Sequence, residues 1–183
     1  MQSIDYTYDR QGQTVGMTDA NGTEHVYDLD KLGRLTQDRV VTLAAGIDGA
    51  VRRIATTYNN RGLATKVTSF DNAAVGSGSV VNEVERVYNA FNQMTEDRQE
   101  HDGAVDGSTL KVAYAYADAS ANTVRRTSVT YPSGKVVNIS YGAADSTDDR
   151  LSRMAETAVG GEGSGLAQFT WMGLARLVKL NLP

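Results

Sequence analysis

The sequence repeats one short phrase, and this repetition constrains the fold more than any other feature. The phrase has the pattern Tyr-x-Tyr-Asp-x-x-Gly, and its first copy spans residues 6–12. A second copy spans residues 27–35, with Leu29 in place of the second tyrosine. Weaker copies begin at Tyr58 and Tyr88, and a last one spans residues 169–177. Because such a unit is too small to bury an apolar face alone, the repetition predicts an array of neighbouring units.

The spacing of the copies supports an array. The steps from Tyr58 to Tyr88 and from Tyr141 to Trp171 are both thirty residues. The step from Tyr27 to Tyr58 is thirty-one residues. A nearly constant step indicates one structural element per repeat.

Each phrase ends with the composition of a tight turn. A type I turn favours Asp or Asn at its first position and Gly at its fourth. The phrase supplies these pairs as Asp9 and Gly12, Asp30 and Gly33, and Asn59 and Gly62. We expect Asn92 to replace glycine in the fourth copy, because Asn tolerates a left-handed backbone. Ala175 tolerates it less well, so we expect the last turn to be altered or strained.

A second set of turns alternates with the first. Asn21-Gly22 is a two-residue hairpin signal. Tyr131-Pro132-Ser133-Gly134 has Pro at the second turn position and Gly at the fourth. The other midpoints are longer hairpin loops rich in small residues, at 44–50, 72–79, 101–108 and 160–165.

Between the turns, apolar residues recur with a period of two. Leu110, Val112, Tyr114 and Tyr116 form one such row. This alternation is typical of half-buried antiparallel strands with one covered face and one wet face. The sequence therefore predicts an all-β fold, an antiparallel meander of about a dozen strands over a single repeat region, residues 1–183. It does not predict a compact two-layer globule or a separate catalytic domain.

Composition excludes several function classes. The formal net charge of −4 argues against nucleic acid, which requires a concentrated cationic surface. The chain has no cysteine, so it has no disulfide framework and no thiolate metal site. No apolar run approaches the roughly twenty residues that span a bilayer. The first residues show no signal-peptide pattern, and both ends lack a polar cap, so we expect a piece of a longer array.

These residues resemble a known family. The segments 8–12 and 27–36 are similar to the YD repeat of Rhs proteins, of the shell subunits of bacterial Tc toxins, and of teneurins. The segment 131–137 resembles the other half-repeat of that family. The sequence departs from the family pattern at Leu29, Asn59, Asn89, Asn92, Met172 and Ala175, and in an insertion between Tyr141 and Arg150.

The resemblance implies a long β ribbon that curves and spirals into a hollow shell around a C-terminal toxin domain. The conserved cleavage segment and the toxin domain of such proteins are not found in this sequence. The implied role is therefore that of a shell wall, extracellular or at the cell surface as part of a larger protein. The implied partners are flanking repeats of the same parent chain and an enclosed toxin domain.

Metal binding and histidine catalysis are poorly supported. Asp28 and Asp30 resemble the start of a calcium loop, but Leu32 and Arg39 stand where oxygen ligands are needed. His25 and His101 each follow a glutamate, and adjacent strand residues point to opposite faces. We therefore expect no metal, no cofactor and no enzymatic activity.

Other charged residues have simpler structural interpretations. A glycosidase needs two carboxylates across a cleft, and the acidic clusters near 97–102 and 145–156 are more simply solvated loop tips. The arginine pairs at 52–53 and 125–126 should each split across two faces of a strand.

The tyrosines leave two interpretations open. A ladder of rings on stacked hairpins stabilises a sheet through cross-strand contacts. The same ladder could bind carbohydrate or protein on a cell-surface stalk. Unpaired edge strands also permit self-association. The residues that we expect to fix the repeats are Tyr8, Asp9, Gly12, Tyr27, Asp30, Gly33, Arg34, Tyr58, Gly62, Tyr88, Tyr131, Gly134, Tyr141, Trp171 and Arg176.

Overall fold

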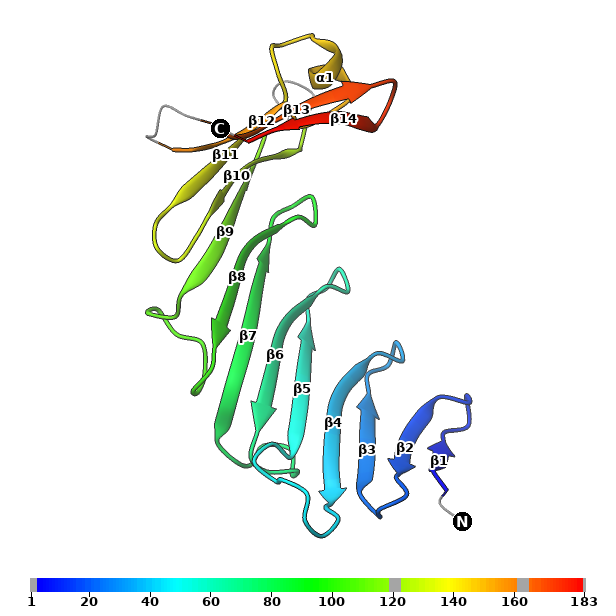
Figure 1. Ribbon diagram of the computed structural model, residues 1–183. Coiled ribbons are helices and arrows are strands. Elements are labelled where there is room, and N and C mark those ends of the chain that lie inside the picture. Colours follow the sequence, from blue (N-terminus) through cyan, green and yellow to red (C-terminus); the bar gives the residue numbers. More distant parts are fainter. Residues whose placement is uncertain (1–2, 119–122, 161–164, 183) are drawn as a thin grey trace. The chain divides into compact units, whose positions relative to one another are not determined.

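The structure, a computed structural model, describes residues 3–118, 123–160 and 165–182. Within these ranges the chain forms fourteen strands and one short helix, in two units that divide after Leu110. The expected all-β class is confirmed, and the strands are four to nine residues long (Figure 1). The expected loop at 160–165 falls largely on residues 161–164, which lie outside the described residues.

The first unit is an antiparallel meander in which every strand pairs with the next along the chain. Its strands are β1 (Asp5–Tyr8), β2 (Thr14–Thr18), β3 (Glu24–Leu29), β4 (Leu35–Thr42), β5 (Arg53–Tyr58), β6 (Ala64–Phe70), β7 (Val80–Tyr88) and β8 (Met94–Glu100).

The second unit follows the same plan with one insertion. Its strands are β9 (Lys111–Tyr116), β10 (Arg126–Thr130), β11 (Val136–Ser140), β12 (Glu156–Val159), β13 (Gly165–Met172) and β14 (Arg176–Asn181). Helix α1 (Thr147–Arg150) lies between β11 and β12. Ser146 caps it by accepting a hydrogen bond from the backbone N–H of Asp149.

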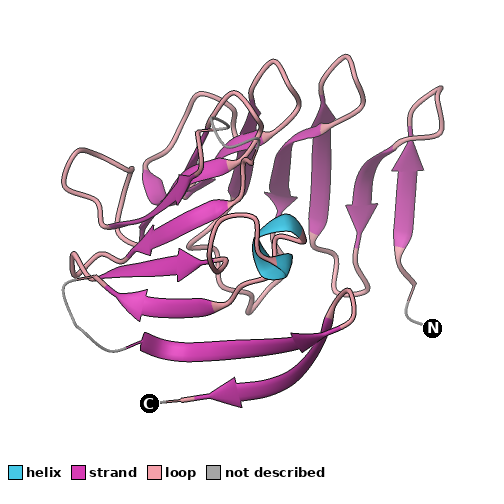
Figure 2. Ribbon diagram, turned by 90° about the horizontal axis from the view of Figure 1, so that it is seen from above, coloured by secondary structure: helices cyan, strands magenta, loops and turns pink. Residues whose placement is uncertain are grey.

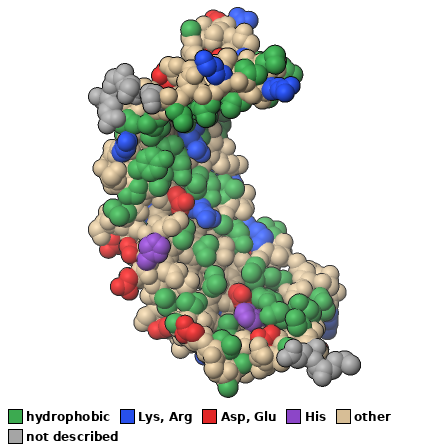
Figure 3. Space-filling view, viewed as in Figure 1, with side chains coloured by type: hydrophobic (Ala, Val, Ile, Leu, Met, Phe, Trp, Pro, Cys, Tyr) green, Lys and Arg blue, Asp and Glu red, His purple; other side chains and the backbone are tan. Residues whose placement is uncertain are grey.

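The sheet in each unit is a single layer, and connections alternate between the two ends of the strands (Figure 2). Val159 is the one buried hydrophobic residue among those described, whereas six polar or charged residues are buried. Apolar and charged side chains are interspersed on the face seen in Figure 3. The expected alternation of covered and wet faces is clear in β13, but β4 and β6 are half-buried on both faces. Stability therefore depends on contacts between neighbouring strands rather than on a central apolar core.

Candidate functional site: contacts that join successive hairpins

Five turns share one hydrogen-bond pattern, which confirms the turn chemistry expected from the sequence. A side-chain oxygen of the first residue accepts from the backbone N–H groups two and four positions ahead. In the second repeat, Asp30 Oδ1 accepts from Leu32 at 2.8 Å and from Arg34 at 3.0 Å. The N–H of the fourth residue donates to the carbonyl of the first, as from Gly33 to Asp30 at 2.9 Å. The turns with this pattern begin at Asp9, Asp19, Asp30, Asn59 and Asn89.

The turn at Asp19 corrects the interpretation of Asn21-Gly22 as a two-residue hairpin loop. That loop type requires positive φ at both residues, but only Gly22 has it, at 90°. Asp19 instead accepts from Asn21 and Thr23, like the first residue of every other turn in the set. The side chain of Asp19 therefore decides the turn type.

The irregular turns behave as their sequences indicate. Asn92 has φ of 62° and replaces glycine in the fourth copy. Gly134 has φ of 80° in the turn that begins at Tyr131 and joins β10 to β11. In the last copy the positive φ moves from the position of Ala175 to Gly173, at 61°. Met172 then pairs with Arg176, which gives a shorter loop.

Register shows which residues are equivalent between repeats. Leu29 pairs with Leu35 as Tyr58 pairs with Ala64, so Leu29, and not Tyr27, occupies the position of Tyr58. The step of thirty-one residues from Tyr27 therefore joined residues at different positions. Tyr27 lies two residues before Leu29. Its pKa is raised, mainly by burial and secondly by the negative charge of Asp38.

Four aromatic residues, each at or next to the end of a strand, reach back to the preceding hairpin. The hydroxyl of Tyr58 donates to the carbonyl oxygen of Leu35 at 3.0 Å. Tyr88 donates in the same way to Ala64 at 3.1 Å. In the second unit, Tyr141 donates to Arg126 at 2.9 Å, and Trp171 Nε1 donates to Met154 at 2.7 Å. We call these four contacts the inter-hairpin clasp, and the side chains that make them are half-buried.

Arginines strengthen the clasp at two of these tyrosines. Arg34 forms an ion pair with Asp30 at 2.6 Å, and its guanidinium lies 4.4 Å from the ring centre of Tyr58. The hydrogen bond from Arg34, with those from its backbone and from Leu32, holds the pKa of Asp30 below its usual range. In the second unit, Arg125 lies 4.1 Å from the ring centre of Tyr141 and pairs with Asp149. One signature arginine thus connects a turn to the next hairpin.

A further arginine connects two turns directly. Arg61 Nη1 donates to the carbonyl oxygens of Asn89 and Ala90 at 2.9 and 3.0 Å. It also donates to Asn92 Oδ1 at 2.8 Å. The turn that begins at Asn59 therefore holds the turn that begins at Asn89.

The turn of each copy of the repeated phrase is followed by a bulge that the sequence analysis missed. Pairing skips one residue after the turn, and the skipped residues are Val15, Thr36, Thr65, Thr95 and Val178. Thr36 donates its hydroxyl across the hairpin to the carbonyl of Asp28 at 2.9 Å. The recurrence of a β-branched residue three positions after Gly12, Gly33, Gly62 and Asn92 was the available signal.

Two buried charges lie under the long loops, at equivalent positions. Arg53 and Glu83 are 3% and 4% exposed, and each stands five residues before a clasp tyrosine. Arg53 donates to the carbonyls of Ala74 and Ser77 in the loop after β6. Glu83 accepts from the N–H of Val105 in the loop after β8 at 3.2 Å. Each charge therefore fixes a loop over the sheet.

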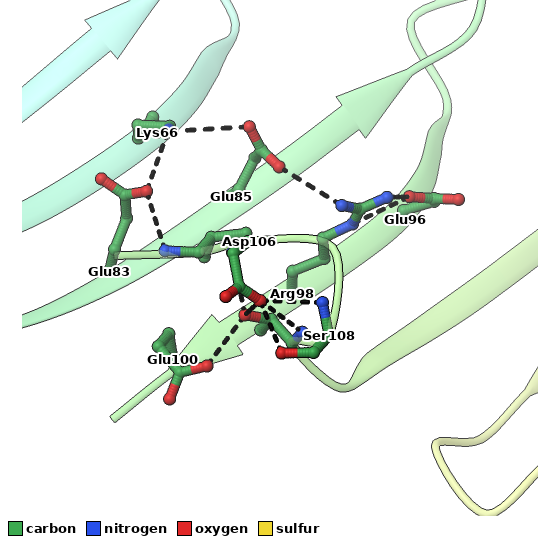
Figure 4. Close-up of polar contacts among 10 residues, drawn as sticks. Lys66, Glu83, Glu85, Glu96, Arg98, Glu100, Asp106 and Ser108 are labelled. Atoms are coloured by element: carbon green, nitrogen blue, oxygen red, sulfur yellow. Dashed lines mark hydrogen bonds and ion pairs between the residues drawn. The ribbon is translucent and has the colours of Figure 1, made fainter. Parts of the chain in front are cut away.

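Glu83 belongs to an ionic network (Figure 4). Lys66 Nζ lies 2.8 Å from Glu83 and 3.7 Å from Glu85, and Arg98 bridges Glu85 and Glu96. Burial alone would raise the pKa of Glu83, but the hydrogen bonds from Lys66 and Thr68 outweigh it and lower this pKa. Its hydrogen bond to Glu83 raises the pKa of Lys66.

Several other candidate groups are engaged in structural contacts. His25 Nδ1 lies 2.7 Å from Asp38 Oδ1 on β4, a partner that the sequence analysis did not identify. Asp28, once compared with a calcium ligand, binds Arg39 through two hydrogen bonds of 2.8 and 3.0 Å. In the insertion, Asp145, Asp148 and Asp149 each pair with an arginine. Arg52 and Arg53 bind backbone carbonyls of different segments.

The remaining signature residues lie on the surface or in turns. Tyr8 and Tyr131 are exposed, at 60% and 46%. Gly12 and Gly62 have φ of 81° and 85°. Arg176 is exposed at the start of β14.

The described residues contain neither a candidate metal site nor a membrane-spanning helix. No group of three or more acidic, histidine or cysteine side chains gathers there in a geometry that could hold a metal ion. None of the helices described there has the length and apolar character needed to cross a membrane.

Comparisons with known proteins gave structural matches only. No family model and no curated protein matches the sequence. The chain is similar to the crystal structure of TcdB2-TccC3 without its hypervariable C-terminal region, with 12% identity and a TM-score of 0.45 over 98% of this chain. It is also similar to the structures of TcdB2-TccC3-Cdc42, with 12% identity and a TM-score of 0.43 over 98% of this chain, and of TcdB2-TccC3-TEV, with 13% identity and a TM-score of 0.42 over 91%. The match covers 10% of the length of each of these three chains.

Proposed function

We propose that this chain is a structural wall segment of an Rhs-type shell that encapsulates a toxin or effector payload. The observation that carries the proposal is the clasp contact made by both Tyr58 and Tyr88 to the hairpin before their own. A contact that recurs with the repeat allows hairpins to be added in series without a new core for each one. Such an array is suited to building an extended wall.

The distribution of charge supports a structural role. The buried charges Arg53 and Glu83 hold loops, and the carboxylates of the insertion pair with arginines. A catalytic carboxylate or histidine needs a free face toward a substrate. These groups are instead used to join one segment of the chain to another.

The tyrosine rings distinguish the wall from a carbohydrate-binding stalk. A stalk would present a row of flat, open rings. Tyr58 and Tyr141 are each covered by an arginine, and their hydroxyls are bonded to backbone carbonyls. The rings therefore support the wall more than the stalk.

The proposed partners are further repeats of the same parent chain and an enclosed toxin domain. The outer strand β14 exposes Leu177, Val178 and Leu180, and an edge strand of this kind accepts another strand. The same edge also permits self-association. A role of this kind places the parent protein outside the cell or at its surface.

Protease protection tests the proposal. The parent polypeptide would be treated with protease in its intact form and in a form that carries Gly62→Val and Tyr88→Phe, which loosen the wall. We expect the downstream domain to survive in the intact form and to be cleaved faster in the variant. Equal cleavage in both forms, or saturable binding of this segment on a glycan array, would argue for the stalk.

A further inference from the structure

Arg53 is a buried cation whose charge is not neutralised by a neighbouring residue. Its two Nη atoms donate to the carbonyls of Ala74 and Ser77, and its guanidinium lies 3.9 Å from the ring centre of Phe70. Its Nε is buried without a hydrogen-bond partner. No carboxylate among the described residues forms an ion pair with it. A buried charge in this state is destabilising unless a counter-ion is supplied.

The next repeat shows how the chain neutralises a charge at this position. Glu83 is the equivalent of Arg53, thirty residues later, and Lys66 pairs with it at 2.8 Å. Lys66 stands eight residues after the clasp tyrosine Tyr58, and the corresponding residue one repeat earlier, eight after Leu29, is Gln37. Gln37 carries no charge. The repeat that contains Arg53 therefore lacks the counter-ion that the next repeat has.

The charged residue opposite Arg53 on the next strand does not supply this counter-ion. Arg39 is the cross-strand partner of Arg53, and like charges placed opposite each other are unfavourable. Asp28 binds Arg39 through both carboxylate oxygens. One positive charge thus remains at Arg53.

A cavity adjoins this charge. Gln37, Arg53, Phe70, Val75 and Gly76 line it, and its volume is about 280 Å³, roughly that of nine water molecules. The Oε1 atom of Gln37 is buried without a hydrogen-bond partner, as is Nε of Arg53. The pocket therefore brings an apolar wall of Phe70 and Val75 next to the side chain of Arg53, whose charge has no counter-ion among the described residues.

We propose that this cavity binds a small organic carboxylate, which accepts a hydrogen bond from Nε–H of Arg53. The apolar part of the ligand packs against Phe70 and Val75. Binding requires the side chain of Gln37 to turn aside, and this movement breaks no hydrogen bond of Oε1. The proposal does not depend on the proposed shell role, because it rests only on contacts within this chain.

Propionate is a suitable probe, since it has one carboxylate and a short apolar body. Melting temperature would be measured with sodium propionate, with sodium chloride at equal ionic strength, and with propionamide as the neutral analogue. We expect a saturable rise of about 2 °C or more with propionate alone. The side-chain Nε–H signal of Arg53 in ¹⁵N NMR should move with the same saturation curve. Equal effects of propionate and chloride, or an unmoved Arg53 signal, would overturn the proposal.

A variant provides a second test that leaves buried Arg53 in place. Gln37→Glu supplies an internal carboxylate at the position from which Lys66 reaches Glu83 in the next repeat. We expect this variant to melt above the wild type and to lose its response to propionate. Gln99→Glu, on an exposed position of β8, is the matched control and should retain both the wild-type melting temperature and the response. A Gln37→Glu variant that melts below the wild type, or still responds to propionate, would contradict the site.

Discussion

Tyr88 donates a hydrogen bond of 3.1 Å to the carbonyl oxygen of Ala64, which lies on the hairpin before its own. Tyr58 makes the same contact with Leu35. A single-layer sheet has little apolar core to hold its hairpins together, so a repeated polar contact between them has a large share in its stability. The tyrosine of the repeat thus stabilises the array through its hydroxyl as well as through its ring.

Removal of the hydroxyl should therefore weaken the array. We expect Tyr88→Phe to lower the free energy of unfolding by about 1 kcal/mol, the usual value of one hydrogen bond. Tyr58→Phe should cost less, because its contact is more exposed. Urea unfolding measures both. Tyr8→Phe is the control, since Tyr8 is exposed and no described residue is within hydrogen-bond distance of its hydroxyl; a loss at Tyr8 equal to that at Tyr88 would contradict the clasp.

The turn glycines should be sensitive to a single methyl group. Gly62 has φ of 85°, where a Cβ would touch only Arg34 Nη1, at 3.6 Å. Gly62→Ala should cost about 1–2 kcal/mol through backbone strain alone. Gly107→Ala is the matched control, because Gly107 has ordinary φ and no atom within 4 Å of an added Cβ. Denaturant midpoints of the two variants should differ clearly, and equal midpoints would exclude strain at Gly62.

Removing only Lys66 from its ion pair with Glu83 should destabilise the fold more than removing both residues. Lys66→Met leaves a buried carboxylate without its cation, so we expect a loss of about 3 kcal/mol. The double variant Lys66→Met/Glu83→Leu removes both charges and should recover much of that loss. Lys31→Met, at an exposed turn tip, is the control. A double variant as unstable as Lys66→Met would show that the pair is not the source of the effect.

The same pair predicts how stability depends on pH. The pKa of Glu83 is lower in the folded state, so its contribution is present above the unfolded pKa and is lost as pH falls through the folded pKa. The pKa of Lys66 is raised, so its contribution is present below the unfolded pKa and is lost as pH rises through the folded pKa. The difference in unfolding free energy between wild type and Glu83→Gln should therefore be largest near neutral pH and shrink in acid. A difference that is constant with pH would contradict this account.

Arg34 should control the acidity of Asp30. Its hydrogen bond is the main cause of the lowered pKa of Asp30. We expect Arg34→Met to raise this pKa, as followed by ¹³C NMR of the carboxyl group. Arg10→Met, at an exposed turn position, should leave it unchanged. An Asp30 pKa that is the same in Arg34→Met and wild type would show that Arg34 is not the main cause of the lowered pKa.

The turns were predictable from sequence because their determinants are local. An Asp or Asn followed by Gly three positions later is enough to specify both the hydrogen bonds and the positive φ, as at Asp30 and Gly33. The Asn21-Gly22 prediction failed because the Asp19 side chain, two residues earlier, stabilises a different turn. Local rules also gave the meander, since consecutive strands joined by short turns pair with each other.

The contacts between hairpins were not predictable, because they join residues from different repeats. Tyr58 and Leu35 are far apart in sequence, and their contact depends on the register of two strands. The buried states of Arg53 and Glu83 depend on loops that fold back over the sheet. The thirty-residue step from Tyr58 to Tyr88 already places these two residues at one position of the repeat, but it does not reveal their burial.

The most direct test of the account is the register between hairpins. Val67 on β6 lies opposite Val84 on β7, and these two strands belong to different hairpins. We expect Val67→Cys/Val84→Cys to form an intramolecular disulfide at low protein concentration, because paired Cα atoms lie within disulfide range. Val67→Cys/Glu85→Cys, in which the second thiol points to the other face, should remain reduced. Equal oxidation of both pairs, or none in either, would contradict the ordered array of hairpins.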